Sequence, residues 1–256
     1  MKITILTLFP DMFTSFFNNS IIKRAITKKL VEIEIVNIRD FTKDKHHRVD
    51  NPPFGGGAGL IMMCQPIIDC LNSVKSTDSK VFLTSPRGQT FNQEKAIEMS
   101  KLDHIIFICG HYEGIDERVN NYIDEPISIG DFILTGGEAA VIAMSDAIIR
   151  LIPGVINQES TIDESFMNGL LEYPQYTYPY NYDDYLVPDI LFCGNHQAID
   201  KYHHREALKI TKKYRPDLFN KLHLSSKELE LLNESEDHQP SWEKDAIEKG
   251  KKFIKN

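Results

Sequence analysis

The sequence has no uninterrupted apolar run long enough to cross a bilayer, which excludes a transmembrane helix. Its opening stretch, MKITILTLFP, is too short and too strand-like for a secretory signal peptide. The four cysteines, Cys64, Cys70, Cys109 and Cys193, form no C-x-x-C pair and no zinc spacing, so we predict reduced, buried thiols. A soluble cytoplasmic protein with no membrane partner is therefore expected.

The sequence is also short of positive charge. It holds 29 lysines and arginines against 37 aspartates and glutamates, and the net charge of −8 argues against a nucleic-acid partner, because phosphate binding relies on cations. The deficit is uneven, since residues 110–190 carry fifteen acidic side chains and only two arginines, whereas residues 201–221 carry seven cations and two acids. The second stretch predicts either a solvated helix face or a local surface for RNA.

Familiar nucleotide-binding motifs are absent. The glycine-rich run 55–59 is followed by Leu60 where G-x-G-x-x-G requires its last glycine, and no Gly-Lys-Ser/Thr follows, so neither a dinucleotide fingerprint nor a P-loop is present. The run predicts either a tight turn or a backbone surface, around Gly57 and Gly59, that a large ligand such as an RNA loop can approach closely. The histidines form no metal spacing, so no metal ligands are assigned.

What the sequence does contain is a series of strand patterns, each followed by a helical one. These patterns predict an α/β fold with a parallel sheet. The expected strands are 2–8, 31–38, one opening at residue 81, one opening at 104 and 127–134, and the expected helices are 12–30, 65–74 and 136–150. Thr90 with Gln93, and Thr135 with Glu138, have capping-box spacing and predict helix starts.

Three of the expected strands end in loops that are rich in glycine or proline. The three stretches, strand and loop together, are residues 81–88, 105–114 and 128–137. Because the carboxyl ends of parallel strands meet at one edge of a sheet, we place the active site at that edge. In the second loop, flanking glycines leave Tyr112 and Glu113 free to face a ligand; taken alone this loop fits an ordinary turn before a helix better, and the other two loops favour the ligand site. Cys109, with no cation beside it, favours an inert thiol over a nucleophile.

The second half of the chain predicts a change of domain. Helix 136–150 is almost wholly apolar, which predicts burial on more than one side and a second subunit. Residues 157–167 are polar and aperiodic, so we predict a domain of residues 1–156, a flexible linker at 157–167 and a helical domain of residues 168–256. The helices expected there lie near 195–215 and 226–233, and the order of the charged tail from residue 234 is left open.

Five motifs, in this order along the chain, together resemble the TrmD family of bacterial tRNA (guanine-N1-)-methyltransferases, of the SPOUT class. They are GGGAG at 55–59, CGHYEGIDER at 109–118, SIGDFILTGGE at 128–138, RLIPGV at 150–155 and GNH at 194–196. The resemblance runs from residue 2 to about residue 233. It implies a SPOUT parallel sheet with a deep trefoil knot on the C-terminal side of the N-terminal domain, a rare exception to the rule against threaded chains, plus a small helical C-terminal domain. It also implies an obligate homodimer with its active sites at the interface.

The same resemblance implies the ligands. In the family a methyl group passes from S-adenosyl-L-methionine to N1 of the guanine 3′ of the anticodon, so the expected partner is the tRNA anticodon stem-loop. The residues implied for the methyl donor are Ser85, Pro86, Gly110, Tyr112, Glu113, Gly114, Ser128, Ile129, Gly130, Asp131, Phe132, Ile133, Leu134, Gly136 and Gly137. For RNA we expect contacts from Gly57, Gly59, Lys201, Arg205, Lys209, Lys212 and Lys213.

The expected catalytic residues follow from the chemistry and the family pattern. Guanine N1 carries a proton that a positioned base must remove before N1 can attack a methyl group. The family base is an aspartate directly before Ser-Phe, a position held here by Glu164; Asp163 stands one step earlier and is slightly favoured for its shorter side chain. Arg150 matches the family arginine that would contact guanine O6. The family is associated with Mg²⁺, but the sequence offers no dedicated ligand set.

Two alternatives to this assignment stay open. One is a SPOUT methyltransferase that acts on another RNA, and the other is a catalytically inactive relative that binds RNA. Two positions depart from the family pattern, because His111 and Tyr178 stand where arginine is usual. Each departure removes a full positive charge, so RNA binding here is expected to depend more on residues 201–221.

Overall fold

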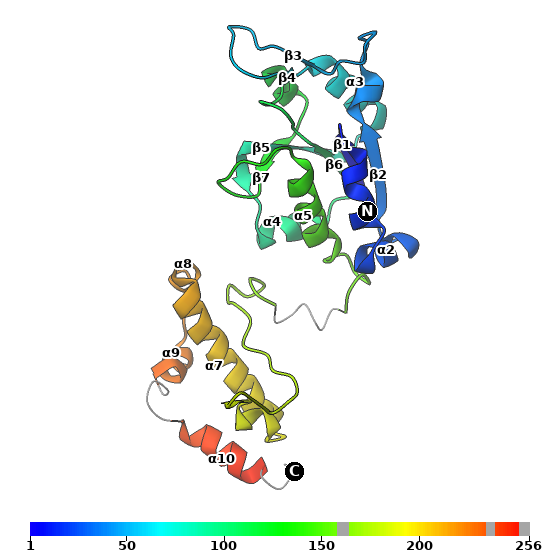
Figure 1. Ribbon diagram of the computed structural model, residues 1–256. Helices are drawn as coiled ribbons and strands as arrows, with labels where there is room; N and C mark the ends of the chain where they lie inside the picture. Colours follow the sequence, from blue (N-terminus) through cyan, green and yellow to red (C-terminus); the bar gives the residue numbers. More distant parts are fainter. Residues whose placement is uncertain (158–163, 234–238, 251–256) are drawn as a thin grey trace. The chain divides into compact units, whose positions relative to one another are not determined.

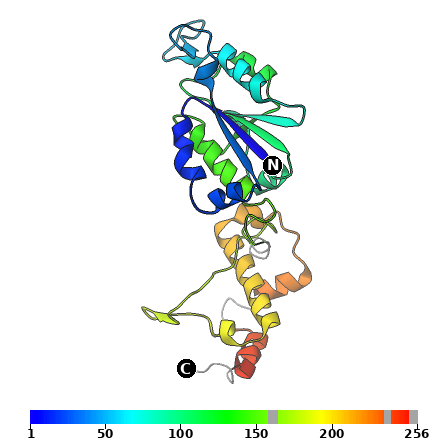
Figure 2. The same cartoon turned by 90° about the vertical axis from the view of Figure 1, so that its right-hand side faces the viewer.

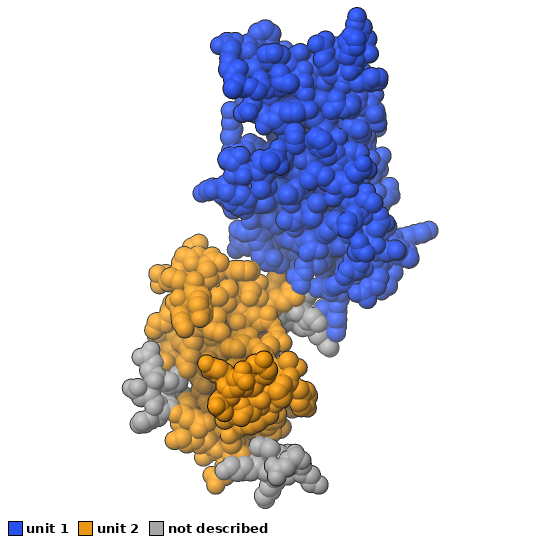
Figure 3. Space-filling model, viewed as in Figure 1, with its two compact units in different colours: residues 1–158 blue, residues 159–256 orange. Residues whose placement is uncertain are grey.

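The computed structural model describes residues 1–157, 164–233 and 239–250. The chain divides into two compact units, unit 1 with residues 1–158 and unit 2 with residues 159–256 (Figure 3). Each unit has apolar clusters of its own. Within the described ranges, every helix falls short of the length and apolar character that a bilayer crossing requires.

Unit 1 is built on a parallel sheet of five strands in the order β2-β1-β6-β5-β7. Its strands are β1 (Lys2–Thr7), β2 (Glu32–Asn37), β5 (Ser79–Thr90), β6 (His104–Ile108) and β7 (Glu125–Ser128), and a separate antiparallel ribbon pairs β3 (Asp50–Asn51) with β4 (Ile61–Met62) (Figure 1). Its helices are α1 (Thr14–Phe17), α2 (Ser20–Thr27), α3 (Cys64–Val74), α4 (Gln93–Met99) and α5 (Glu138–Ile149), with 3₁₀ helices at Pro10–Phe13, Ile38–Phe41 and Glu117–Asn121. This α/β architecture with a parallel sheet is the predicted one.

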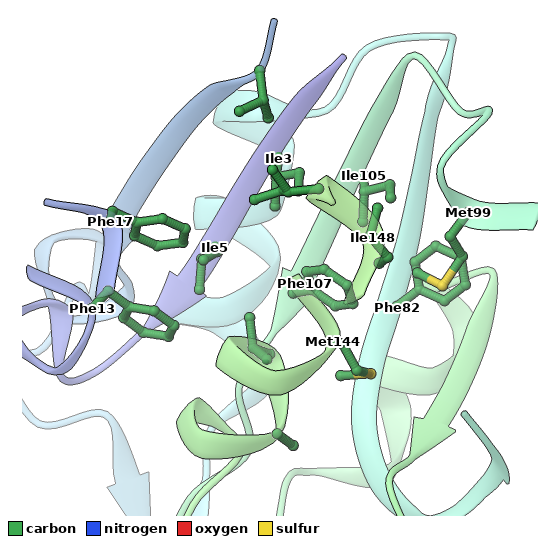
Figure 4. Packing of buried hydrophobic residues seen from close by; sticks show 14 of the residues in the cluster. Ile3, Ile5, Phe13, Phe17, Phe82, Met99, Ile105, Phe107, Met144 and Ile148 are labelled. Carbon is green, nitrogen blue, oxygen red and sulfur yellow. The ribbon is translucent and has the colours of Figure 1, made fainter. Parts of the chain in front are cut away.

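Both faces of the sheet are buried. On one face Phe107 of β6 packs beside Met144 and Ile148 of α5, in a cluster that also takes in residues of α2 (Figures 2 and 4). On the other face Ile106 and Ile108 pack in a second cluster with α3. A strand buried on both sides cannot alternate between apolar and polar residues, which explains the unbroken apolar run of β6.

Two predicted elements of unit 1 were wrong in extent. The helix expected at 12–30 is broken, because the side chains of Asn18 and Asn19 donate to the carbonyls of Thr14 and Ser15 at 2.8 and 2.7 Å and end the first turn. The strand expected to reach residue 134 ends at Ser128, since the Ser128 hydroxyl and the left-handed Gly130 form a turn.

Both predicted capping boxes were also wrong. Thr90 lies in β5, and the carboxamide of Asn92 caps α4 by accepting from the Lys95 amide at 2.9 Å. Helix α5 has no side-chain cap, because its first residue, Glu138, turns its carboxylate inward to the hydroxyl of Thr7. The spacing of a capping box is a local signal. At α4 a neighbouring residue, Asn92, caps the helix instead, and at α5 the carboxylate of Glu138 is bound by Thr7 of a distant strand.

Unit 2 is helical, as its sequence pattern predicts. Its helices are α7 (His196–Tyr214), α8 (Pro216–Phe219), α9 (Ser226–Asn233) and α10 (Ser241–Gly250), with a 3₁₀ helix at Asp189–Phe192 and a projecting hairpin of β8 (Asn181–Tyr182) and β9 (Tyr185–Leu186) (Figure 2). Helix α10 forms in the tail whose order the sequence left open. It is tied to α7 by a buried ion pair, with Arg205 Nη1 2.6 Å from Glu243 Oε2.

The prediction of reduced, buried cysteines is confirmed for three of the four. Cys70, Cys109 and Cys193 are buried and free, while Cys64 is only partly buried. Burial raises the pKa of the Cys70 thiol to about 12 and that of Cys109 well above its ordinary value. Both thiols therefore stay protonated, which excludes a nucleophilic role at neutral pH.

Candidate active site

A cleft of about 1970 Å³ opens at the carboxyl-terminal edge of the sheet in unit 1. It is lined by the three predicted loops together with ribbon β3–β4. Of the fifteen residues expected to hold a methyl donor, all except Asp131 line it. The structure thus brings together segments that lie some fifty residues apart in the chain, at the edge where the strand order placed them.

The hydroxyl of Thr84 joins two of these loops. Thr84 Oγ1 accepts a hydrogen bond from the Gly110 amide at 3.1 Å and donates one to the Ile108 carbonyl at 3.2 Å. The third loop is attached by the Gly137 amide, which donates to the Gly110 carbonyl at 2.8 Å. A Cβ added at Gly137 would overlap Thr84 Oγ1 and lie 3.0 Å from Cys109 Cα, so only glycine fits where these loops meet.

The third loop turns sharply and then exposes apolar side chains. The Ser128 hydroxyl accepts from the Gly130 amide and donates to the Gly130 carbonyl, both at 3.1 Å. Beyond this turn Phe132, Ile133 and Leu134 are 55%, 82% and 42% exposed. Three consecutive exposed apolar residues beside a cleft are typical of a surface that another molecule covers.

Ribbon β3–β4 holds the loop that carries Tyr112 and Glu113. The Glu113 amide donates to the Leu60 carbonyl at 3.1 Å, and the Met62 amide donates to the Gly114 carbonyl at 3.0 Å. Gly59, at φ +80°, leaves no room for a side chain against Glu113, whereas a Cβ added at Gly57 would make an ordinary contact with Pro53 at 3.5 Å. The glycine-rich run 55–59 therefore contacts the loop that carries Tyr112 and Glu113, which is expected to bind the methyl donor.

Tyr112 is held in an uncommon backbone conformation, at φ +59°. Partial burial and the nearby Asp50 carboxylate raise the pKa of its hydroxyl, while the Arg39 guanidinium acts in the opposite direction. Its side chain is 41% exposed at the cleft.

A buried carboxylate underlies the cleft, and the sequence patterns gave it no such role. Glu138 is 1% exposed; its Oε1 accepts from Thr7 Oγ1 at 2.7 Å and its Oε2 lies 3.9 Å from His111 Nδ1. The His111 ring packs on Phe9, with centroids 4.6 Å apart, and its Nδ1 is buried with no hydrogen-bond partner in the described chain. Sequence reasoning counted Glu138 only as a capping residue and overlooked Thr7 and Thr84, since isolated threonines in strands carry no signal.

The expected catalytic residues come from segments of the chain other than the three loops and the ribbon that line this cleft. Arg150 follows α5, whose twelve residues span about 18 Å from the cleft to their far end, and Arg150 is not among the described residues that line the cleft. Glu164 belongs to unit 2, in a loop that the Leu171 amide fastens to Thr211 Oγ1 at 2.8 Å. Asp163 lies outside the described residues.

The cations expected to bind RNA differ in their surroundings on α7. Lys212 and Lys213 are exposed, Lys209 lies 3.4 Å from Glu206, and the ammonium of Lys201 lies 4.2 Å from the centre of the Trp242 ring. Arg205 is only 5% exposed and is paired with Glu243 and Glu206. We therefore assign Arg205 to the packing of unit 2 and leave it out of the RNA surface proposed below.

No group of three or more histidine, cysteine, aspartate or glutamate side chains converges to hold a metal ion in the described ranges. Magnesium thus remains an expectation from the resemblance, and no step below depends on it.

A family model described as tRNA (guanine-1)-methyltransferase TrmD matches residues 1–221. The chain belongs to the TrmD family. Among the TrmD relatives, the tRNA (guanine-N(1)-)-methyltransferase of Malacoplasma penetrans (strain HF-2) is 54% identical over 221 residues, which cover 86% of this chain and 98% of that protein. The enzyme of the same name from Clostridium tetani (strain Massachusetts / E88) is 54% identical over 237 residues, covering 92% and 99%. The family resemblance of the motifs is confirmed, and α10 lies beyond the part that the TrmD model matches.

Proposed function

We propose that this protein transfers a methyl group from S-adenosyl-L-methionine to N1 of the guanine on the 3′ side of the tRNA anticodon. The observation that carries the proposal is that, in a chain of the TrmD family, the loops of the family motifs gather in one cleft. Because the proposed substrate is tRNA, we assign the reaction to the cytoplasm.

The cleft suits the methyl donor. Gly136 and Gly137 leave no space for side chains, so a ligand there meets bare backbone amides and carbonyls, while Ile129 and Leu134 offer apolar surface for a purine ring. When bound, S-adenosyl-L-methionine supplies an electrophilic methyl group on a sulfonium sulfur. The part of the protein is to orient that group and to exclude water, which the interlocked loops at Thr84 and Gly110 support.

Charge placement carries the catalysis in this proposal. A carboxylate, Asp163 or Glu164, removes the N1 proton of guanine, and the Arg150 guanidinium stabilises the negative charge that develops on guanine O6. No cysteine takes part, consistent with the protonated thiols of Cys70 and Cys109.

The two candidate bases can be separated by single-turnover methylation with Asp163→Asn and Glu164→Gln. We expect Asp163→Asn to slow the methyl-transfer step by about a hundredfold or more and Glu164→Gln to slow it less, because a positioned general base contributes a factor of that order. Donor binding should survive both changes. If neither variant slows the step, the base lies elsewhere.

We further propose a homodimer in which Arg150 of one protomer completes the cleft of its partner. Two observations support this: Arg150 follows the end of α5 that points away from the cleft of its own chain, and the exposed apolar run at residues 132–134 borders that cleft. Helix α5 also leaves Ala139 and Ala143 exposed, a smooth apolar strip that a second copy can cover.

For unit 1 we propose the trefoil knot of the SPOUT class. The sheet order is consistent with it, because β6 lies between β1 and β5, two strands that both precede it in the chain. Close passage of distant segments supports it as well: an added Cβ at Gly88 would overlap the backbone of Ile127. For unit 2 we propose tRNA binding, with the exposed Lys212 and Lys213 among its contacts.

Methylation of defined transcripts tests the function. The purified protein, labelled S-adenosyl-L-methionine and two tRNA transcripts that differ only in guanine or adenine 3′ of the anticodon should yield 1-methylguanosine from the first alone. Equal labelling of both transcripts would indicate another RNA target. No labelling, together with no donor binding by calorimetry in the presence or absence of tRNA, would indicate a non-catalytic RNA-binding protein.

A further inference from the structure

A cluster of four cations at and just beyond helix α2 has no role in the function proposed above. Lys23, Arg24, Lys28 and Lys29, here called the α2 basic cluster, are all exposed. Within the described part of the chain none of them takes part in an ion pair, and no acidic residue occurs between Asp11 and Glu32. In a chain with a net charge of −8, an unpaired group of this size is a local positive surface.

The backbone at Lys29 is strained, which indicates that a positive side chain is retained there despite a loss of stability. The Lys29 amide donates to the Ile26 carbonyl at 2.9 Å and the Leu30 amide to the Ala25 carbonyl at 3.0 Å, the two hydrogen bonds of a Schellman motif. Lys29 occupies its left-handed position, at φ +59°, where glycine is usual and a side chain strains the backbone. The helix dipole favours a cation at the C-terminus of α2, but Lys28 already supplies one, so the dipole alone does not account for a lysine at the strained position.

The cluster lies beside the end of α5 that precedes Arg150. Leu30, next to Lys29, packs against Gly154, whose added Cβ would lie 3.6 Å from Leu30 Cδ1. Ile26 of α2 and Leu151 pack on the same apolar cluster. Figure 1 likewise shows α2 and the C-terminal end of α5 at the same end of unit 1. A nucleotide that reaches Arg150 therefore brings its neighbouring phosphates toward the α2 basic cluster.

We propose that the α2 basic cluster binds phosphates of the tRNA backbone beside the target guanine. The inference rests on the proposed function for the identity of the RNA and on the contacts above for the location. An anionic membrane surface fits less well, because among the described residues 14–30 no large apolar side chain is exposed for insertion. Phosphate contacts of this kind add affinity and fix position without reading sequence.

Direct binding of an unmodified tRNA transcript, measured by filter retention over a range of salt concentrations, tests the proposal without requiring catalysis. For Lys28→Gln/Lys29→Gly we expect the Kd to rise about tenfold and the slope of log Kd against log salt to fall by about 2. Donor affinity should stay unchanged. Lys75→Gln, a change at an exposed lysine after α3 on the other face of the sheet, is the matched control and should leave the Kd unchanged.

Lys29→Gly alone separates a binding role from a structural one. Because glycine relaxes the left-handed position, this variant should melt at the same temperature as the parent or higher while binding tRNA more weakly. An unchanged Kd and salt slope in the double variant would overturn the proposal, as would cluster-dependent sedimentation with anionic vesicles alongside unchanged tRNA binding. A protein that binds tRNA through the cluster but makes no 1-methylguanosine would overturn the proposed function and leave this inference standing.

Discussion

Individual polar side chains connect the loops of the cleft, and the most important of them is Thr84. Its hydroxyl accepts a hydrogen bond from the Gly110 amide and donates one to the Ile108 carbonyl. Thr84→Val keeps the shape and removes both hydrogen bonds, so we expect a loss of about 1–3 kcal/mol in the free energy of unfolding, measured by urea denaturation, and weaker donor binding by calorimetry. Thr84→Ser keeps the hydroxyl and serves as the control; equal losses in both variants would assign the effect to the methyl group.

His104 should make the stability of unit 1 depend on pH. The imidazole is buried, with Nε2 2.9 Å from Thr4 Oγ1 and Nδ1 2.8 Å from Ser79 Oγ. Burial, aided by the Lys2 ammonium, lowers its pKa below the ordinary value of 6.5. The unfolded chain therefore binds a proton more readily than the folded one, so the contribution of His104 is complete above about pH 6.5 and is lost as the pH falls through the lowered folded pKa.

Melting temperatures between pH 7.5 and 5 would measure this effect. We expect the parent protein to lose stability over that range more steeply than His104→Asn, which is less stable at pH 7.5 but has no imidazole to protonate. If the melting temperatures of the two proteins fell in parallel with pH, groups other than His104 would cause the loss of stability in acid.

The residues of the cleft could be predicted where they stand in glycine-rich loops after apolar strands, because strand direction alone gathers those loops. Fourteen of fifteen expected donor residues line the cleft for that reason. Thr7, Thr84 and Glu138 could not be predicted, since their roles depend on pairings between strands that are distant in sequence. For the same reason the buried ion pair between Arg205 and Glu243 could not be predicted from the positions of the charged residues in the sequence.

At the start of helix α5, the junction of three loops depends on one glycine. An added Cβ at Gly137 meets Thr84 and the backbone of Cys109, whereas one at Gly110 finds its nearest atoms at 3.5 Å, an ordinary contact. We expect Gly137→Ala to lower the free energy of unfolding by about 1–3 kcal/mol and Gly110→Ala to change it by less than about 0.5 kcal/mol. Chemical denaturation of both variants checks the contrast, and similar values would show that the loops can part to admit a methyl group.

Helices and strands followed their sequence patterns in type, but their ends did not. Helices α7 and α9 lie where periodicity put them, at residues 196–214 and 226–233. The predicted helix 12–30 breaks at Asn18 and Asn19, whose side chains compete for backbone carbonyls, an outcome that apolar spacing does not record. Cap assignments at Thr90 and Thr135 failed because Asn92 and a tertiary contact of Glu138 took over.

For the assembly, subunit mixing tests whether the active site is shared. Arg150→Ala has an intact cleft, and Ser85→Trp has a filled one with its arginine intact. If Arg150 acts on the cleft of the partner, dimers formed by joint refolding of the two inactive proteins regain one complete site in the mixed species, about a quarter of the parent activity at equal amounts. An arginine that serves its own cleft would leave every mixed dimer inactive, and a monomer on sedimentation would overturn the proposed dimer itself.

The α7–α10 contact has a practical consequence for anyone who shortens this chain to the part shared with its relatives. Cutting before Ser241 would remove Glu243, the counter-ion of a guanidinium that is 5% exposed, and would uncover Cys193, whose backbone Gly250 touches so closely that no side chain fits there. Stranding a buried cation typically costs 3–5 kcal/mol. A protein truncated in this way for crystallisation or inhibitor screening would thus be prone to aggregation. Purification tags are better attached at the N-terminus.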